Sequence, residues 1–252
     1  MTLSQETARK LRLMKMGGIV DIVESQDAIA ENWNMNFHER MDNLVDQLYQ
    51  IKNNKRIDTL CRQARFKWPK ADVQSMLFTR ERDLEKTVSL NLDSCIFVES
   101  TKSVCLYGPT GCGKSYAACA IGKSACRHCY RVRYVRFPDL MSDYALLESP
   151  SARVRYLNKF SKYDVLIIDE WLKDVPDEES ISFIFELMER REDKHPTIFC
   201  SQYAPAQWVS RMGASVKSES IIDKVIYDSV VIKFGNFNMR DYLAKTNPKK
   251  WC

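Results

Sequence analysis

Several features that would mark particular classes of protein are missing from this sequence. No uncharged apolar run approaches the roughly 18 residues that a membrane-spanning helix needs. Residues 1–15 carry four basic side chains but no apolar stretch of the kind found in secretory signals. The sequence has neither an internal repeat nor a low-complexity tract, and its 45% apolar and 28% charged residues, close to the globular average, exclude wholesale disorder and fibrous repeats. These absences predict a cytoplasmic protein whose 252 residues form one large globular domain or two small ones.

Glycine and proline, which break helices, are scarce in the first part of the chain. No glycine lies between Gly18 and Gly108, and no proline precedes Pro69. Apolar residues recur there with helical spacing, and the pattern is interrupted only at Asn53 and Asn54. We therefore expect a helical segment that Pro69 ends.

Positive charge is concentrated in this helical segment. The formal net charge is only +5, yet residues 50–70 contain seven lysine or arginine residues and a single acid, Asp58. Clustered positive charge is typical of a surface that binds a polyanion, most often nucleic acid. The other interpretation is a solvated helix face, and the segment alone does not decide between the two. The candidate DNA-binding side chains are Lys52, Lys55, Arg56, Arg62 and Arg65.

The nine cysteines are an odd number and are scattered, so they do not form the pattern of a disulfide framework. Cys126 and Cys129 flank His128, which would suit a metal ion. A zinc site needs four ligands, however, and the chain has no second pair at a recognisable spacing. Cys126 and Cys129 also fall within a predicted helix. We therefore expect them to behave as small apolar residues rather than as metal ligands.

After residue 102, short runs rich in β-branched residues alternate with helical patterns. A continuous apolar run is typical of a strand that is buried on both faces. Strands that alternate with helices predict an α/β fold with a parallel sheet covered on both faces. The expected strands are residues 103–107, 132–137, 164–168, 197–200 and 230–234.

A glycine-rich motif follows the first of these strands and opens a predicted helix. It reads Gly-Pro-Thr-Gly-Cys-Gly-Lys-Ser and fits the phosphate-loop pattern G-x-x-x-x-G-K-[ST]. Its glycines let the backbone wrap a phosphate, and the helix N-terminus adds partial positive charge. We expect Lys114 to reach the β- and γ-phosphates of ATP and Ser115 to offer its hydroxyl to Mg²⁺. The predicted nucleotide-binding residues here are Gly108, Pro109, Thr110, Gly111, Cys112, Gly113, Lys114, Ser115 and Tyr116.

Two adjacent acids end the apolar strand 164–168. Ligands of an open α/β sheet lie beyond the carboxyl ends of its strands. We therefore expect Asp169 to hold Mg²⁺ and Glu170 to be the general base that activates water. A hydrolytic base argues against a small-molecule kinase, which needs a dry site. The nearby aromatic residues Trp171 and Trp208 could stack on nucleic acid bases, but we expect them to pack against the sheet.

Segments along nearly the whole chain resemble one known family in their order and spacing. Residues 37–40 resemble its "F-E-E-R", residues 62–66 its "K-x-A-R-F", residues 129–134 its "G-Y-R-V-R-F", residues 163–170 its Walker B strand and residues 222–225 its "L-D-R-L". The sequence is thus similar to AAA+ ATPases, and among them to the IstB family of transposition helper proteins, which are related to DnaC-type helicase loaders. The resemblance implies an AAA+ domain with a five-stranded parallel sheet over residues 71–252. A small helical domain for DNA binding or oligomerisation would precede it, over residues 1–70.

The resemblance also implies roles for three further residues. Gln202 stands where the family has an asparagine sensor that positions the attacking water, and it is one methylene longer. Lys224 stands at the arginine finger, which reaches the γ-phosphate of a neighbouring subunit, but lysine lacks arginine's planar fork. Arg211 is the alternative finger. Arg240 matches a late arginine that contacts the nucleotide of its own subunit.

The function implied is that of an ATP-dependent oligomer in the bacterial cytosol. It would assemble on double-stranded DNA through ATP-bridged interfaces, assist a transposase, and hydrolyse ATP slowly with Mg²⁺. Two alternatives stay open. A DnaC-type loader would keep the same motor but hold a replicative helicase, and the "K-x-A-R-F" segment disfavours it. An ATP-binding DNA scaffold with weak hydrolysis would account for the unusual residues Gln202 and Lys224.

Overall fold

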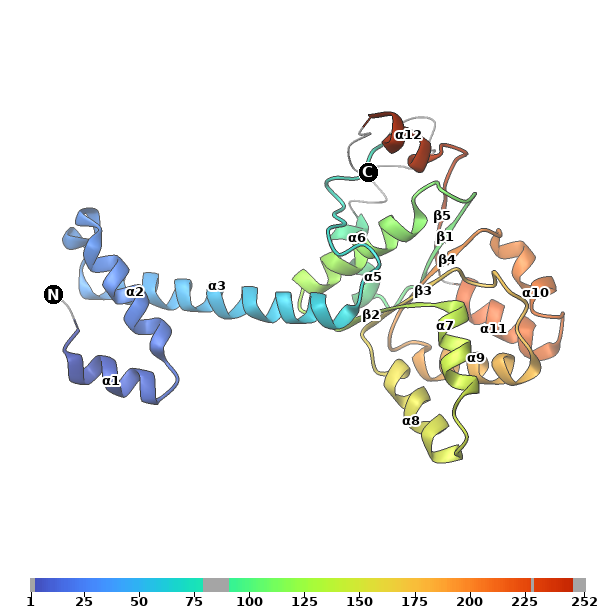
Figure 1. Cartoon of the computed structure of the whole chain (residues 1–252), viewed down its shortest axis with the longest axis horizontal. Coiled ribbons are helices and arrows are strands. Elements are labelled where there is room, and N and C mark those ends of the chain that lie inside the picture. The colour runs from blue at the N-terminus through green and yellow to red at the C-terminus, as the bar shows by residue number, and fades with distance from the viewer. Residues whose placement is uncertain (1–2, 79–90, 228, 247–252) are drawn as a thin grey trace. The chain divides into compact units, whose positions relative to one another are not determined.

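The computed structural model describes residues 3–78, 91–227 and 229–246 (Figure 1). The chain forms two compact units, Met1–Thr59 and Leu60–Cys252. The first unit is helical, as expected, and its last helix continues into the second unit. The helices are α1 (Gln5–Leu13), α2 (Gly17–Ala28), the short 3₁₀ helix η1 (Ala30–Asn34) and α3 (Phe37–Ala64).

Local capping sets where the long helix α3 begins. The backbone N–H of Asn36 donates to the Glu39 carboxylate at 2.8 Å, and the N–H of Glu39 donates back to the Asn36 side chain at 3.0 Å. This reciprocal capping box satisfies two N–H groups that have no partner within the helix. The helix then runs through Asn53 and Asn54 without a break. Asparagine costs only about 0.7 kcal/mol relative to alanine in a helix, so these two residues do not end it.

The prediction that Pro69 ends the helical segment is wrong. α3 ends at Ala64, and Arg65 adopts a left-handed backbone conformation with φ 57°. Residues 60–70, which the sequence pattern assigns to the helical domain, belong to the second compact unit. Ala64 and Phe66 are both buried in its core.

The second unit contains a five-stranded sheet in the order β2-β3-β4-β1-β5. Every pair of neighbouring strands is parallel, which confirms the predicted fold class. The carboxyl ends of all five strands therefore lie at one edge of the sheet. The strands are β1 (Val104–Tyr107), β2 (Val132–Arg136), β3 (Val165–Asp169), β4 (Thr197–Ser201) and β5 (Val230–Lys233).

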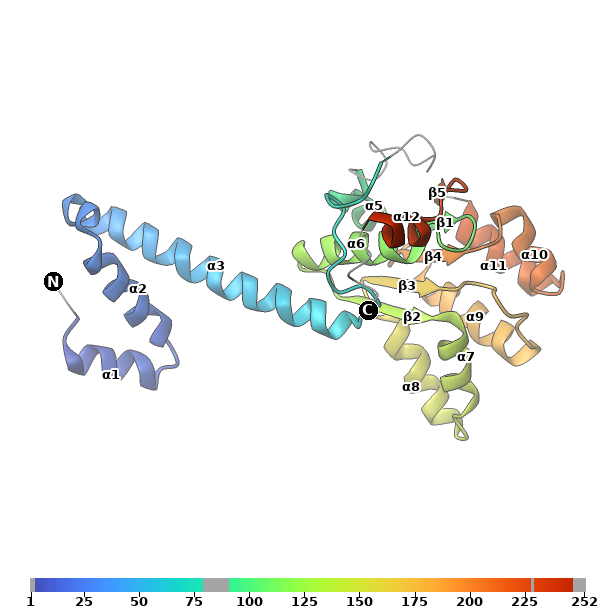
Figure 2. The same ribbon diagram turned by 45° about the horizontal axis from the view of Figure 1, so that its top comes forward.

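Helices cover both faces of this sheet because alternate strand residues point to opposite sides. Figure 2 shows α6 on one face and α7, α8 and α9 on the other. Ile167 packs with α6 in one apolar cluster, whereas Leu166 and Ile168 pack with α9 and α11 in the second. The helices of this unit are α5 (Ile96–Glu99), α6 (Lys114–Arg127), α7 (Phe137–Ala145), α8 (Pro150–Ser161), α9 (Glu178–Arg191), α10 (Trp208–Arg211), α11 (Val216–Ile226) and α12 (Met239–Thr246), with a 3₁₀ turn, η3 (Pro205–Gln207).

The two tryptophans singled out in the sequence belong to this core. Trp171 is 1% exposed and Trp208 is fully buried, and their rings meet edge to face with centroids 5.9 Å apart. Trp171 also contacts Phe199 of β4, with ring centroids 4.8 Å apart. Packing against the sheet is thus confirmed, and neither ring is available to stack on a base.

Six of the eight described cysteines are buried packing residues, whereas Cys129, expected within the helix, follows the end of α6 and is half-buried. Cys126 is buried in the α6 cluster, and the structure contains no disulfide among the residues it describes. Within the same residues no group of three or more histidine, cysteine or acidic side chains could hold a metal ion. Nor does any described helix combine the length and the apolar character needed to span a membrane.

Candidate nucleotide-binding site

The glycine-rich loop between β1 and α6 adopts a conformation that its glycines make possible. Gly108, Gly111 and Gly113 have φ values of 148°, 85° and 100°, in the region that disfavours other residues. A Cβ atom at Gly111 would lie 2.6 Å from the Asn238 side chain. The N–H of Met239 also donates to the Gly111 carbonyl at 3.0 Å. The start of α12 therefore packs directly on the phosphate loop.

Lys114 is the first residue of α6, and its side chain turns back over the loop. Its Nζ donates to the carbonyls of Gly108 at 2.7 Å and Pro109 at 2.8 Å. Cys112 Sγ lies 3.6 Å from the same nitrogen. α6 begins without a side-chain cap, so its first N–H groups face the loop and favour an anion there.

Asp169, the last residue of β3, is almost completely buried and is held at both carboxylate oxygens. Oδ1 accepts the backbone N–H of Glu170 at 2.9 Å, and Oδ2 accepts the Tyr134 hydroxyl at 2.6 Å. Burial raises the pKa of Tyr134, and the neighbouring charge of Asp169 raises it further. The tyrosine therefore stays protonated and acts as the donor in this pair.

Glu170 has a left-handed backbone, with φ 59°, which turns its side chain away from the direction of the strand. Its carboxylate accepts from Arg136 Nη2 at 2.8 Å and pairs with Lys173 at 3.3 Å. The hydrogen bond from the Arg136 guanidinium is the main cause that lowers the pKa of Glu170. Glu170 is therefore ionised and already bound to a cation.

The loop that follows Glu170 is braced by a second arginine. Leu172 also has a left-handed backbone, with φ 54°, and such residues cost about 1–3 kcal/mol unless their surroundings hold them. Arg211 donates to the carbonyls of Leu172 and Lys173, both at 2.8 Å, and its guanidinium lies 3.9 Å from the centre of the Tyr203 ring. Arg211 thus supports the loop beside the candidate base of its own chain.

A cavity of about 90 Å³ lies where these elements meet, at the carboxyl ends of β3 and β4. Eight of the residues expected from the sequence line it: Thr110, Gly111, Lys114, Ser115, Asp169, Glu170, Gln202 and Arg240. Five further lining residues are not among those expected: Lys67, Trp171, Lys173, Cys200 and Ser201. Lys67 and Lys173 add positive charge that suits phosphate. The position of Lys173 three residues after Glu170 is a signal that the sequence offers, whereas nothing in the local sequence marks Lys67.

Some of the expected nucleotide-binding residues do not line this cavity. Tyr116 faces the segment before β1, where its hydroxyl lies 2.7 Å from Ser75 Oγ and accepts the N–H of Asp72 at 3.4 Å. Cys112 is buried at 2% exposure. Gly108, Pro109 and Gly113 supply backbone to the loop around Lys114.

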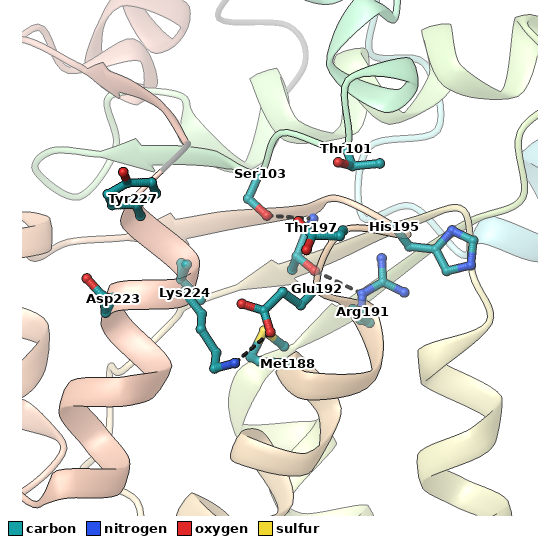
Figure 3. Close-up of a pocket in the computed structure, with 12 residues that line it drawn as sticks. Thr101, Ser103, Met188, Arg191, Glu192, His195, Thr197, Asp223, Lys224 and Tyr227 are labelled. Carbon is teal, nitrogen blue, oxygen red and sulfur yellow. Dashed lines mark hydrogen bonds and ion pairs between the residues drawn. The ribbon is translucent and has the colours of Figure 1, made fainter.

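Lys224 lies in a different cavity, of about 180 Å³, near the amino ends of β1 and β4 (Figure 3). This cavity is at the opposite end of the sheet from the phosphate loop, so Lys224 cannot reach its own chain's nucleotide site. Its Nζ pairs with Glu189 at 2.7 Å and Glu192 at 2.5 Å. The hydrogen bonds that it donates to Glu189 and then to Glu192 raise the pKa of Lys224, which stays charged.

The five candidate DNA-binding side chains are all exposed. Lys52, Lys55 and Arg56 have the i, i+3, i+4 spacing that places them on one face of α3, within the first compact unit. Arg62 and Arg65 belong to the second unit.

A parallel sheet in this strand order, a phosphate loop after β1 and paired acids at the end of β3 define an AAA+ P-loop ATPase fold. The model of the family described as "IstB-like ATP binding protein" matches residues 7–246. The chain belongs to this family.

Individual proteins agree with this assignment. The ATP-binding protein of insertion sequence IS1162 from Pseudomonas fluorescens is 30% identical over 200 residues, covering 79% of this chain and 87% of that protein. The ATP-binding protein of insertion sequence IS21 from Pseudomonas aeruginosa is 27% identical over 239 residues, covering 95% of this chain and 89% of that protein. The crystal structure of the DnaC helicase loader superposes with a TM-score of 0.54 at 17% identity, covering 65% of this chain and 96% of that one. That last likeness concerns the fold alone.

Proposed function

We propose that this protein is a Mg²⁺-dependent ATPase that assembles on double-stranded DNA and assists a transposase. One observation carries the enzymatic part. A phosphate loop, a buried strand-end aspartate, a glutamate and a polar residue after the next strand all line a single cavity. The names of its relatives connect the family with insertion sequences, which supports a role in transposition.

The residues present fit a magnesium nucleotide. Ser115 and Asp169 line the same cavity and offer the hard oxygen ligands that Mg²⁺ prefers. When bound, the ion would neutralise charge that develops on the phosphate oxygens. Lys114 would exchange its contacts with the Gly108 and Pro109 carbonyls for the β- and γ-phosphates.

Glu170 would then accept a proton from the attacking water, as a general base. Its carboxylate must first loosen its contact with Arg136, because a guanidinium-bound carboxylate is a weaker base. Gln202 would orient the water from the end of β4, and Arg240 would contact the phosphates from α12. The isolated chain would therefore hydrolyse ATP slowly, because Arg136 holds the carboxylate of Glu170.

Lys224 would act on a neighbouring subunit, because it lies at the far end of the sheet from its own phosphate loop. In the single chain Glu189 and Glu192 neutralise it. A neighbour's γ-phosphate would compete with these carboxylates for the ammonium group. ATP would thereby join two copies, and hydrolysis would release them.

The exposed basic side chains of residues 52–65 supply the DNA contacts in this proposal. Binding through phosphates should be largely independent of sequence and should weaken steeply with salt, because each neutralised phosphate releases a counterion. We would replace Lys52, Lys55, Arg56, Arg62 and Arg65 together by glutamine and measure duplex affinity against salt. Removal of these five charges should lower the magnitude of the slope of log affinity against log salt by up to about 4.5.

A matched control removes the same charge elsewhere. In this control variant five other exposed lysines are replaced by glutamine: Lys162, Lys194, Lys217, Lys233 and Lys245. We expect this control to keep a slope near that of the wild type. If the first variant keeps the wild-type slope and affinity, the basic segment is a solvated helix face and not the DNA-binding surface.

A further inference from the structure

The side chains of β2 that face the phosphate-loop helix reach the two acids at the end of β3. In the parallel register of these strands, Arg136 lies beside Asp169 and Tyr134 lies beside Ile167. Residues two apart on a strand share a face, so Tyr134 and Arg136 point to the same side. Arg136 contacts Glu170, and Tyr134 contacts Asp169.

We infer that Tyr134 is a positioning residue for the metal-binding carboxylate of Asp169, an inference that rests on the function proposed above. The hydroxyl of Tyr134 donates to Oδ2 at 2.6 Å, inside the protein, where Tyr134 is 7% and Asp169 2% exposed. The other oxygen is fixed by the N–H of Glu170. With one hydrogen bond at each oxygen, the carboxylate cannot rotate freely.

This double attachment matters because Asp169 also lines the nucleotide cavity. Each carboxylate oxygen has two acceptor sites, so one hydrogen bond at each still leaves acceptor capacity. Residues that orient a metal ligand from behind commonly contribute a factor of about 10–100 in metal affinity or activity. The hydroxyl of Tyr134 is thus expected to set how much Mg²⁺ the protein needs to bind nucleotide.

The phenylalanine variant isolates this role, because Tyr134→Phe keeps the ring in the apolar cluster and removes only the hydroxyl. Tyr156→Phe is the matched control. The Tyr156 hydroxyl donates to the Leu140 carbonyl at 3.2 Å, in the cluster on the other face of the sheet. Both variants lose only the hydroxyl of a partly or fully buried tyrosine, and thermal unfolding would report that common effect.

The test measures the affinity for a fluorescent ATP analogue in EDTA and at increasing Mg²⁺. We expect Tyr134→Phe to keep the wild-type affinity in EDTA, while the Mg²⁺ concentration at half-effect rises about tenfold. Tyr156→Phe should match the wild type both in its affinity in EDTA and in the Mg²⁺ concentration at half-effect. An unchanged Mg²⁺ midpoint in Tyr134→Phe overturns the inference. So does a loss of affinity that is as large in EDTA as with Mg²⁺, because such a loss indicates a structural role.

The failure of the proposed function would look different. In that case the wild-type protein would itself fail to bind the analogue, at any Mg²⁺ concentration. If the wild type binds and only the Tyr134 result fails, the nucleotide site stands and Tyr134 has no part in holding its metal ligand.

Discussion

The guanidinium of Arg136 lies 2.8 Å from the carboxylate of Glu170, the residue to which the proposed mechanism assigns the role of base. Arg136 ends β2 and Glu170 directly follows β3, and the β2–β3 register brings the two side chains together. A base that is held by a cation is ionised but restrained. The structure therefore describes a state in which the proposed base, Glu170, is bound by Arg136.

We predict that Arg136→Ala raises ATP turnover in the absence of DNA, because Glu170 loses the partner that weakens it as a base. Stimulation by DNA should shrink accordingly. Steady-state phosphate release with and without duplex DNA measures both. Arg131→Ala is the control, since Arg131 pairs with Asp164 and does not line the nucleotide cavity. Equal losses of turnover with and without DNA would mean that Arg136 orients Glu170 for catalysis instead of restraining it.

Lys114→Ala should abolish measurable ATP binding while the protein remains folded. Lys114 is the charged group of the phosphate loop, and its present partners are two loop carbonyls. Isothermal titration calorimetry gives the affinity, and circular dichroism checks the fold. Lys123→Ala removes a lysine from the same helix outside the cavity and should bind ATP normally. Wild-type affinity in Lys114→Ala would refute the phosphate-loop assignment.

A mixture of the Lys224→Ala and Lys114→Ala variants should be more active than either variant alone, if Lys224 acts across a subunit interface. Lys224→Ala should hydrolyse ATP more slowly than the wild type, and Lys114→Ala should not hydrolyse it at all. A mixed assembly contains some interfaces that pair an intact phosphate loop with an intact Lys224, and these should turn over. Failure to complement, in mixtures that still assemble, would assign Lys224 to its ion pairs with Glu189 and Glu192 alone.

Asp164 provides a pH-dependent contribution to stability that is separate from catalysis. Burial raises its pKa, but hydrogen bonds from the side chain and backbone of Arg131 outweigh burial, so the pKa lies below its ordinary value of 3.8. A lowered pKa stabilises the folded state above the ordinary value, and this stabilisation is lost as the pH falls through the lowered pKa.

We expect Asp164→Asn to lower the free energy of unfolding at pH 7 by about 1–2 kcal/mol. The difference from wild type should shrink as the pH falls below 3.8. Urea unfolding between pH 7 and pH 3 follows this change. Asp42→Asn, at an exposed position of α3, should have almost no effect. A penalty for Asp164→Asn that is the same at all pH values would show that packing, not charge, is responsible.

The parts of this molecule that can be predicted from sequence are those encoded by contiguous residues. The phosphate loop is one short motif, and its glycines must be glycines for steric reasons. β3 and β4 are recognisable because burial on both faces makes them largely apolar. Asp169 ends such a strand and Glu170 follows it directly, and the parallel topology brings this end of the strand to the phosphate loop.

Contacts between segments distant in the chain are not predictable in this way. The pairs Tyr134–Asp169 and Arg136–Glu170 depend on the β2–β3 register, which no local pattern reveals. Lys67 reaches the cavity only because the chain turns sharply at Arg65, whose left-handed backbone is unusual for arginine. The sequence pattern assigns to Pro69 the role that Arg65 has, because proline is a recognisable helix breaker and a strained arginine is not.

Electron microscopy can show whether ATP joins neighbouring copies of this protein on DNA. The Glu170→Gln variant, which should bind ATP without hydrolysing it, would be imaged with duplex DNA in the presence and absence of ATP. We predict ordered oligomers on the duplex with ATP and none without it. Particles that are identical in both conditions, or that leave the DNA bare in both, would contradict ATP-dependent assembly on DNA.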